Sequence, residues 1–409
     1  MIQPFLSADI LLPAGTDLEK WAVIACDQFS SQPEYWQEVR RHVGDAPSCL
    51  HMILPEAELG LENEQTLHNI HQSMQRYLDE GLLQKHPHSF IYVERTLQNG
   101  LIRRGVIGMI DLEHYDYHPG SHSAIRATEQ TVLERIPPRM RIRRGAALDL
   151  PHVILLCDDA DQRILPCAAS KEKPLYDFDL MQGGGRIAAW LVDGERADAL
   201  QAQLDAYCAQ RAQEAEHPLV FAVGDGNHSL ATAKACYEEW KAAHPDAETA
   251  LHPLRYALVE LQNIHDESQQ FEPIHRVVQG TDVNALLATL ESECCAQEGY
   301  PVQWVSASRK GTLLLDPEKG SFAVAILQSF LDSYLQTHPA KIDYIHGEGA
   351  LRQLAAAGDS IGFLLEGMDK NTLFSGVNKD GVLPRKTFSM GHAQEKRYYL
   401  EARMLKAED

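Results

Sequence analysis

The chain has 409 residues, of which 44% are hydrophobic and 23% are charged. These are the proportions of a folded protein, and the length exceeds what one core usually serves, so we expect two or three closely joined domains. Acidic residues outnumber basic ones by 58 to 37, which gives a formal net charge of −21. This excess of negative charge disfavours nucleic acid and anionic membrane surfaces as partners.

The termini and cysteines indicate the compartment. The first residues, Met1 to Phe5, lack the charged-then-apolar plan of a secretory signal, and no run of 18 apolar residues occurs. The eight cysteines contain no C-x-x-C pair, which favours reduced thiols over disulfides or a zinc knuckle. We therefore expect a cytoplasmic protein of bacterial type that acts on a small molecule, and we leave its oligomeric state open.

The apolar pattern predicts a mixture of strands and helices. In the first part of the chain we expect a buried strand at 21–25, helices at 35–43 and 62–84, and a hairpin at 90–110 around Asn99-Gly100. Residues 121–136 are predicted to form a helix that Pro137-Pro138 ends, because proline lacks a backbone N–H and is poorly tolerated inside a helix. A short apolar strand is expected at 153–157.

Further along, strands are expected at 176–180, 186–192, 219–223 and 256–261, with helices at 195–214 and 228–243. After Gly280 we expect helices at 283–292, 322–336 and 348–356, and strands at 302–305, 312–315 and 360–365. The pattern favours an α+β fold. We place the main domain at 1–280, a smaller α+β unit at 281–383, and a C-terminal segment, 384–409, that returns to the main domain.

The segment 219–243 carries the most chemistry. Its predicted strand runs into Gly224-Asp225-Gly226, and a helix follows at once. Glycines permit a tight turn and let a ligand approach the backbone, and the first turn of a helix presents unpaired N–H groups at its positive end. This arrangement is typical of sites that bind phosphate or carboxylate.

The polar residues of this segment have two interpretations. Asp225 could hold a metal ion or take a proton, and His228 could contact a phosphate or transfer a proton. Asn227 and Ser229 could add neutral hydrogen-bond donors. However, an aspartate or asparagine before a helix is often only a cap, and a glycine is often only a turn.

Four stretches resemble one known family. Gly224-Asp225-Gly226-Asn227-His228-Ser229 resembles the Ala-Asp-Gly-His-His-Arg motif of the uncharacterised family called domain of unknown function 1015. The other stretches are Arg126 to Thr131, Phe271 to Arg276, and Arg385 to Thr387, in the order of that family along nearly the whole chain. The family is distantly similar to the ParB/sulfiredoxin-like superfamily, one branch of which is a free-serine kinase.

The resemblance implies a mixed-sheet core of the ParB/sulfiredoxin type, a nucleotide site at the Asp-Gly turn, and phosphoryl transfer to a small molecule. Two positions depart from the motif: Asn227 replaces its first histidine, and Ser229 replaces its arginine. An arginine would bind phosphate bidentately. If the activity is retained, the lost charge must come from Arg126, Arg385 or Lys386.

Our leading hypothesis is a nucleotide-dependent, kinase-like phosphotransferase with a hydroxy-amino acid as acceptor. The residues expected to bind ATP or ADP are Gly226, Asn227, His228, Ser229, Arg126, Lys386 and Thr387. Mg²⁺ is assigned to Asp225, and the residues assigned to catalysis are Asp225, His228, Glu129 and Asp27, the last two as acceptors of the hydroxyl proton. The alternative is a nucleotide- or metabolite-binding regulatory protein without turnover, which the change at Ser229 favours.

A third hypothesis rests on histidines spaced four residues apart. His114, His118 and His122 lie near Asp116 and could hold a transition metal for a hydrolase if they shared a helix face. Pro119-Gly120 would break such a helix, so a solvated polar loop is the simpler interpretation.

Overall fold

A computed structural model describes residues 3–30, 32–59 and 63–406. By their internal contacts the residues form two compact units. Unit 1 comprises Met1–Ala127, Thr131–Gln269 and His392–Asp409, and unit 2 comprises Thr128–Gln130 and Gln270–Gly391. The predicted boundaries at 280 and 384 therefore both fall inside unit 2.

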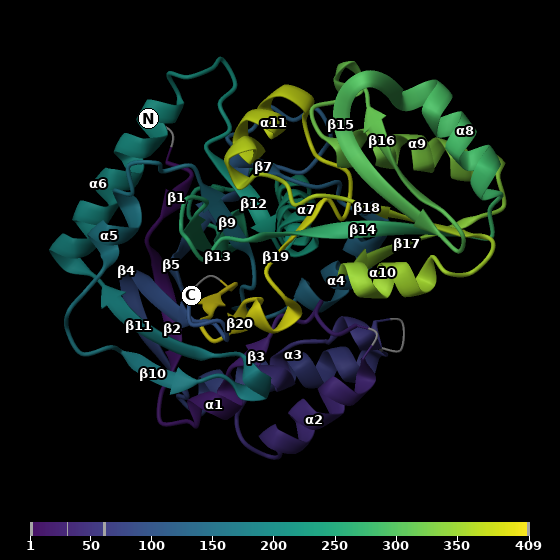
Figure 1. Cartoon of the computed structure of the whole chain (residues 1–409). Coiled ribbons are helices and arrows are strands. Elements are labelled where there is room, and N and C mark those ends of the chain that lie inside the picture. The colour runs from purple at the N-terminus through teal and green to yellow at the C-terminus, as the bar shows by residue number, and fades with distance from the viewer. Residues whose placement is uncertain (1–2, 31, 60–62, 407–409) are drawn as a thin grey trace. The chain divides into compact units, whose positions relative to one another are not determined.

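Unit 1 is organised around a mixed sheet that has eleven strands among the described residues (Figure 1). The strand order is β10-β11-β4-β5-β13-β9-β12-β7-β6, and β1 and β2 add to β5 and β4. The strands are β1 (Phe5–Leu6), β2 (Ala8–Pro13), β4 (Leu83–Thr96), β5 (Ile102–Asp111), β6 (Tyr115–Asp116), β7 (Ile125–Ala127), β9 (Ile154–Cys157), β10 (Tyr176–Asp179), β11 (Arg186–Val192), β12 (Phe221–Asp225) and β13 (Tyr256–Asn263). The pairs β12/β7, β13/β9 and β6/β7 are parallel.

Both faces of this sheet are covered. Along β4, Phe90 and Tyr92 belong to one apolar cluster and Ile91 and Val93 to another, because successive side chains of a strand point to opposite faces. The helices that contribute to the first cluster are α5 (Ile164–Ala168), α6 (Gly194–Arg211) and α7 (Asn227–Ala243). Those that contribute to the second are α1 (Leu18–Trp21), α2 (Pro33–Val43) and α3 (Glu64–Asp79).

The predicted helix at 121–136 is wrong. Residues 125–127 form β7, and the helix of this region, α4 (Ile136–Arg143), begins where the prediction ended. Pro137 and Pro138 stand in the first turn of α4. The N–H groups of a first turn have no partner within the helix, so proline starts this helix and does not stop one. Arg126 consequently lies on a buried strand.

The C-terminal segment returns to unit 1 from residue 392. Its strand β20 (Tyr398–Tyr399) pairs with β3 (Val23–Ile24), and β21 (Arg403–Met404) pairs with β8 (Leu148–Asp149). The indole N–H of Trp21 donates to the carbonyl of Leu400 over 3.0 Å. These contacts hold Lys396 and Tyr399 against residues that are hundreds of positions earlier in the chain.

Unit 2 has its own sheet, with the order β16-β15-β18-β14-β17 and with β19 paired to β14. Its elements are β14 (Phe271–Gln279), α8 (Val283–Cys294), β15 (Cys295–Ser306), β16 (Lys310–Leu315), α9 (Ala323–Thr337), β17 (Lys341–His346), α10 (Glu348–Leu354), β18 (Ser360–Leu364), α11 (Leu373–Asp380) and β19 (Phe388–Met390). A separate apolar cluster fills it. The predicted α+β class, with a smaller second unit, is confirmed.

Within the described part of the chain, no helix combines the length and apolar character needed to cross a membrane.

Candidate functional site at the start of α7

The Asp-Gly motif forms the sharp connection between β12 and α7. Asp225 is the last residue of β12, and Gly226 adopts φ of 80° before α7 starts at Asn227. A side chain at Gly226 would be strained at this φ, and its Cβ would lie 3.0 Å from the Cα of Val153. Position 226 therefore requires glycine for both conformation and space.

The first turn of α7 has one buried polar side-chain atom without a partner and a histidine that is already engaged. No side chain caps the helix at Gly226. The Oδ1 of Asn227 is buried and has no hydrogen-bond partner among the described residues. The Nε2 of His228 accepts the N–H of Val132 over 3.1 Å. The backbone N–H groups of a helix start that has no side-chain cap can bind an anion.

Asp225 is held by two neighbours. Its Oδ1 accepts the N–H of Gly226 over 3.0 Å, and its Oδ2 lies 3.1 Å from the Nζ of Lys396. Lys396 is buried, and it comes from the returning C-terminal segment. Lys396 could not be predicted as a site residue, because no local pattern links position 396 to position 225.

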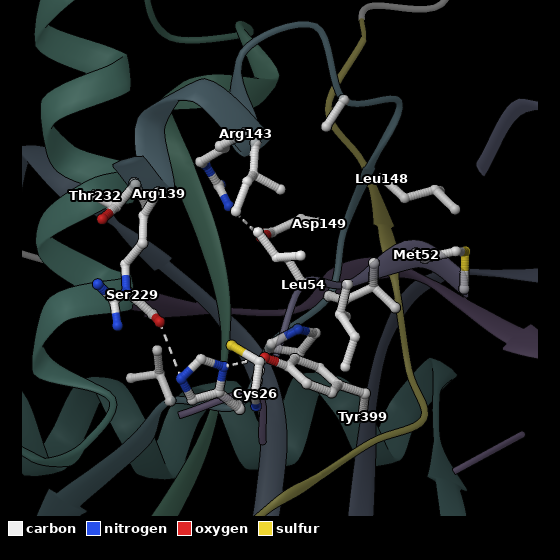
Figure 2. Close-up of a pocket in the computed structure, with 18 of the residues that line it drawn as sticks. Cys26, Met52, Leu54, Arg139, Arg143, Leu148, Asp149, Ser229, Thr232 and Tyr399 are labelled. Atoms are coloured by element: carbon white, nitrogen blue, oxygen red, sulfur yellow. Dashed lines mark hydrogen bonds and ion pairs between the residues drawn. The ribbon is translucent and has the colours of Figure 1, made fainter. Parts of the chain in front are cut away.

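His152 is the centre of the polar cluster beside α7. Its Nε2 is 2.9 Å from the Oγ of Ser229, and its Nδ1 is 2.7 Å from the hydroxyl of Tyr399. Figure 2 shows Ser229 and Tyr399 reaching the same imidazole from different sides. The Oδ1 of Asp27 lies 4.0 Å from the Nε2 of His152. Ser229, which replaces the arginine of the motif, is thus a partner of a buried histidine.

Asp27 is an ionised carboxylate in this cluster. Burial acts to raise its pKa, but the charge of His152 and the hydrogen bond from Gln28 outweigh burial, helped by Lys396 and Arg139, so the pKa lies below its usual 3.8. Burial also raises the pKa of the neighbouring Cys26 thiol to about 12. Asp27 therefore carries a full negative charge at neutral pH beside a protonated thiol.

A cavity of about 130 Å³ adjoins the cluster (Figure 2). Cys26, His152, Ser229 and Tyr399 line one part of it. Two arginines of α4, Arg139 and Arg143, also line it; they are four residues apart, so they share one face of the helix. The other lining side chains are mostly apolar, and they include Met52, Ile53, Leu54, Met74, Ile142 and Leu148.

Each of these arginines has an acidic partner in the cavity wall. The Nη2 of Arg139 is 3.0 Å from Glu56, and the Nη1 of Arg143 is 2.5 Å from Asp149. Burial acts to raise the pKa of Asp149, but Arg143 and Arg403 outweigh it and hold the pKa below 3.8.

The Asp149 pair predicts an acid-sensitive contribution to stability. A carboxyl whose pKa is depressed in the folded state stabilises the protein above its unfolded pKa, and this stability is lost as pH falls through the folded pKa. We expect the difference in free energy of unfolding between wild type and Asp149→Asn to be largest at pH 7 and to shrink below about pH 4. Urea titrations at a series of pH values would measure it. The exposed Asp161→Asn variant serves as control, and a difference that does not change with pH would contradict the prediction.

The other predicted residues have partners of their own within the unit to which each belongs. Arg126 donates from its Nη2 to the carbonyl of His217, which precedes β12, whereas the motif begins at Gly224, near the other end of β12. Glu129, Lys386 and Thr387 belong to unit 2 and meet there: the Glu129 carboxylate accepts the N–H groups of Lys386 and Thr387 over 3.1 and 3.0 Å.

The histidine-rich segment does not form a metal centre. His118 Nδ1 is 2.6 Å from Asp116, and His122 stacks on His217 with ring centroids 4.2 Å apart. Among the described residues, no three histidine, cysteine, aspartate or glutamate side chains converge in a way that could hold a metal ion. The geometry is that of a polar loop with local contacts.

The chain belongs to the family described as Protein of unknown function (DUF1015), whose model matches residues 7–403. Among curated proteins, none is significantly similar to it.

Several solved structures are distantly similar. Free serine kinase in complex with AMP matches with a TM-score of 0.40 at 12% identity, over 73% of this chain and 91% of that chain. A free serine kinase variant in complex with ADP gives a TM-score of 0.40 at 11% identity, with the same coverage. SbnI from Staphylococcus aureus, truncated at its C-terminus, gives 0.36 at 10% identity, over 73% of this chain and 82% of that chain. Likeness at this level does not transfer a function.

Proposed function

We propose that this protein transfers a phosphoryl group from ATP or ADP to a hydroxyl group of a small metabolite. The resemblance of its motif implies a hydroxy-amino acid as acceptor. The observation that carries the proposal is the meeting of Asp27, His152 and Ser229 beside the uncapped start of α7. A carboxylate that can receive a proton therefore lies beside a helix terminus that can bind an anion.

The phosphate side of the site contains two cations, Lys396 and Arg139, which pair with Asp225 and Glu56 in the structure. The start of α7 offers backbone N–H groups, and Lys396 and Arg139 both lie close enough to lower the pKa of Asp27. In phosphoryl transfer the main contribution of a protein is positioning and the stabilisation of charge on the transferred group. Lys396 and Arg139 supply this charge in place of the arginine that Ser229 replaces.

The acceptor side is formed by Asp27 and His152. The acceptor hydroxyl oxygen attacks the terminal phosphorus of the nucleotide, and the bond from that phosphorus to its bridging oxygen breaks. ATP leaves as ADP, or ADP leaves as AMP, and the hydroxyl proton passes to the Asp27 carboxylate. Because Asp27 is ionised at neutral pH, it is ready to accept this proton. Ser229 and Tyr399 hold the ring of His152 between them.

Mg²⁺, when bound, would neutralise the phosphates. Both oxygens of Asp225 already have partners, Gly226 and Lys396. Magnesium usually takes only one or two carboxylates together with substrate phosphates. Asp225 could therefore contribute to a magnesium site only alongside a nucleotide and with Lys396 turned toward a phosphate. The assignment of magnesium to Asp225 stays a prediction, as do the roles of Arg126, Glu129, Lys386 and Thr387.

One observation favours the alternative of a binding protein without turnover. Lys396 neutralises Asp225, and Ser229 is engaged by His152, so neither residue of the motif is free for phosphate chemistry as the protein stands. Nucleotide binding without product, across a panel of acceptors, would favour this alternative over the transferase.

Nucleotide binding tests the proposal directly. Calorimetric titration with ATP, ADP and AMP, with and without Mg²⁺, should give a measurable Kd for at least one of them. Lys396→Ala should raise that Kd about ten- to a hundredfold, because a charge-assisted contact to phosphate is lost. His228→Ala should also weaken binding while leaving the fold intact.

The matched control is Lys241→Ala. Lys241 lies in the last turn of the same helix and pairs with Glu113 over 2.7 Å. Its removal should leave the Kd unchanged. No binding of any nucleotide to the wild-type protein would overturn the proposal.

A further inference from the structure

We infer that the acceptor is a small aliphatic hydroxy acid without an ammonium group, and that Arg143 binds its carboxylate. This inference rests on the proposed function, because it identifies the molecule whose hydroxyl would reach Asp27. It is carried by the cavity that adjoins the cluster of His152 and Ser229.

The cavity has the size of an acceptor and not of a nucleotide. Its volume is about 130 Å³. An apolar cavity of about 150 Å³ takes a molecule as large as benzene, with six heavy atoms. The cavity by itself therefore has room for a compact molecule of roughly that size, and a whole nucleotide would extend beyond it.

One edge of the Arg143 guanidinium has no hydrogen-bond partner among the described residues. Its Nη1 is bonded to Asp149, but its Nε and Nη2 are buried and have no hydrogen-bond partner among the described residues. These two nitrogens form one side of the guanidinium fork, the side that binds a carboxylate through two parallel hydrogen bonds. Buried donors without partners cost free energy, so a carboxylate that pairs with both would be favoured once the guanidinium turns this edge toward the cavity.

The walls of the cavity favour an apolar chain between the polar groups of the ligand. They are mostly apolar, with methionine, leucine and isoleucine the most numerous side chains, and such walls favour an aliphatic chain over a charged one. The Cys26 thiol keeps its proton, because burial raises its pKa to about 12, so it presents no charge to the ligand. A carboxylate at Arg143 and a hydroxyl near Ser229 would then be the two polar ends of the ligand.

An ammonium group would find no unpaired acidic side chain among the described residues that line the cavity. The acidic residues that line the cavity, Glu56 and Asp149, are already paired with Arg139 and Arg143. Burying an ammonium group without an anion or acceptor is costly. The cavity thus favours a hydroxy acid over the hydroxy-amino acid that the sequence resemblance implies.

Three molecules of one shape test this inference. 3-Hydroxybutanoate carries the carboxylate alone, 3-hydroxybutanamide removes its charge, and threonine adds an ammonium group. Calorimetry on the wild-type protein without nucleotide should give a Kd for 3-hydroxybutanoate at least tenfold lower than for either of the other two. An amide that binds as tightly as the acid would overturn the role of Arg143, and threonine binding as tightly as the acid would overturn the exclusion of ammonium.

A variant pair locates the carboxylate. Arg143→Lys keeps a positive charge beside Asp149 but loses the fork, so the Kd for 3-hydroxybutanoate should rise at least tenfold. Arg144→Lys changes the next residue, whose side chain is half exposed and pairs with Glu239, and it should have no effect. An unchanged Kd in Arg143→Lys would contradict the inference.

The two proposals can fail separately. If nucleotides bind but 3-hydroxybutanoate does not, the acceptor assignment is wrong and the proposed transferase stands. If 3-hydroxybutanoate binds through Arg143 and no nucleotide binds, the proposed transferase is wrong and the carboxylate site stands.

Discussion

Replacement of Asp27 by asparagine should slow phosphoryl transfer by about 10²- to 10⁴-fold, the usual contribution of a positioned general base. Asparagine keeps the shape of the side chain but cannot accept the proton of the acceptor hydroxyl. The nucleotide Kd should change by less than about threefold, because Asp27 is placed on the acceptor side of the site. Single-turnover rates with ATP, ADP and a panel of hydroxy acids would measure the loss.

The control for Asp27 is Asp45→Asn, an exposed aspartate just after α2. It should transfer phosphate at the wild-type rate. A full rate in Asp27→Asn would remove Asp27 from the mechanism. Loss of nucleotide binding in that variant would place Asp27 on the nucleotide instead of the acceptor.

Replacement of Arg397 by methionine should lower the free energy of unfolding of unit 1 by about 3–5 kcal/mol. Arg397 is buried and bridges two buried carboxylates: its Nη1 pairs with Glu260, and its Nη2 lies 2.6 Å from Glu401. The hydroxyl of Tyr176 also donates to Glu401 over 2.5 Å. Removing the cation leaves two carboxylates in a poorly solvated interior, which is the costly way to break a buried ion pair.

Urea denaturation followed by tryptophan fluorescence would measure this loss, because four of the five tryptophans (Trp21, Trp36, Trp190 and Trp240) belong to unit 1. Arg186→Met is the matched control. Arg186 also bridges two carboxylates, Asp177 and Asp179, but its side chain is 49% exposed. Exposed pairs contribute about 0–1 kcal/mol, so an equal loss in both variants would contradict the role of burial.

The β12–α7 connection could be predicted from the sequence because its causes are local. An apolar run, two glycines and a helical repeat lie within 25 residues of one another. The helix begins one residue before its predicted start at 228, and the strand ends two residues beyond its predicted end at 223. Glycine adopts the φ of 80° at position 226 with the least strain, so the presence of glycine there indicated the turn.

The failure at 121–136 has an equally local cause. Two prolines end a helix or start one, and their identity does not say which. Because of that error, the arginines of α4 were not predicted as site residues, and Arg126 was expected on a helix. In the structure Arg126 reaches the carbonyl of His217, and Arg139 and Arg143 face the cavity instead.

The sequence by itself determined the α+β class and the turn at Gly226, because each depends on neighbouring residues in the chain. It also singled out Asp27 as a candidate proton acceptor. Only the tertiary structure decided what surrounds them. His152, Lys396 and Tyr399 reach the site through strand pairing and chain return over as many as 373 positions. Such contacts depend on which elements pack against one another in the folded chain. Periodicity along the sequence predicts the elements but not their packing partners.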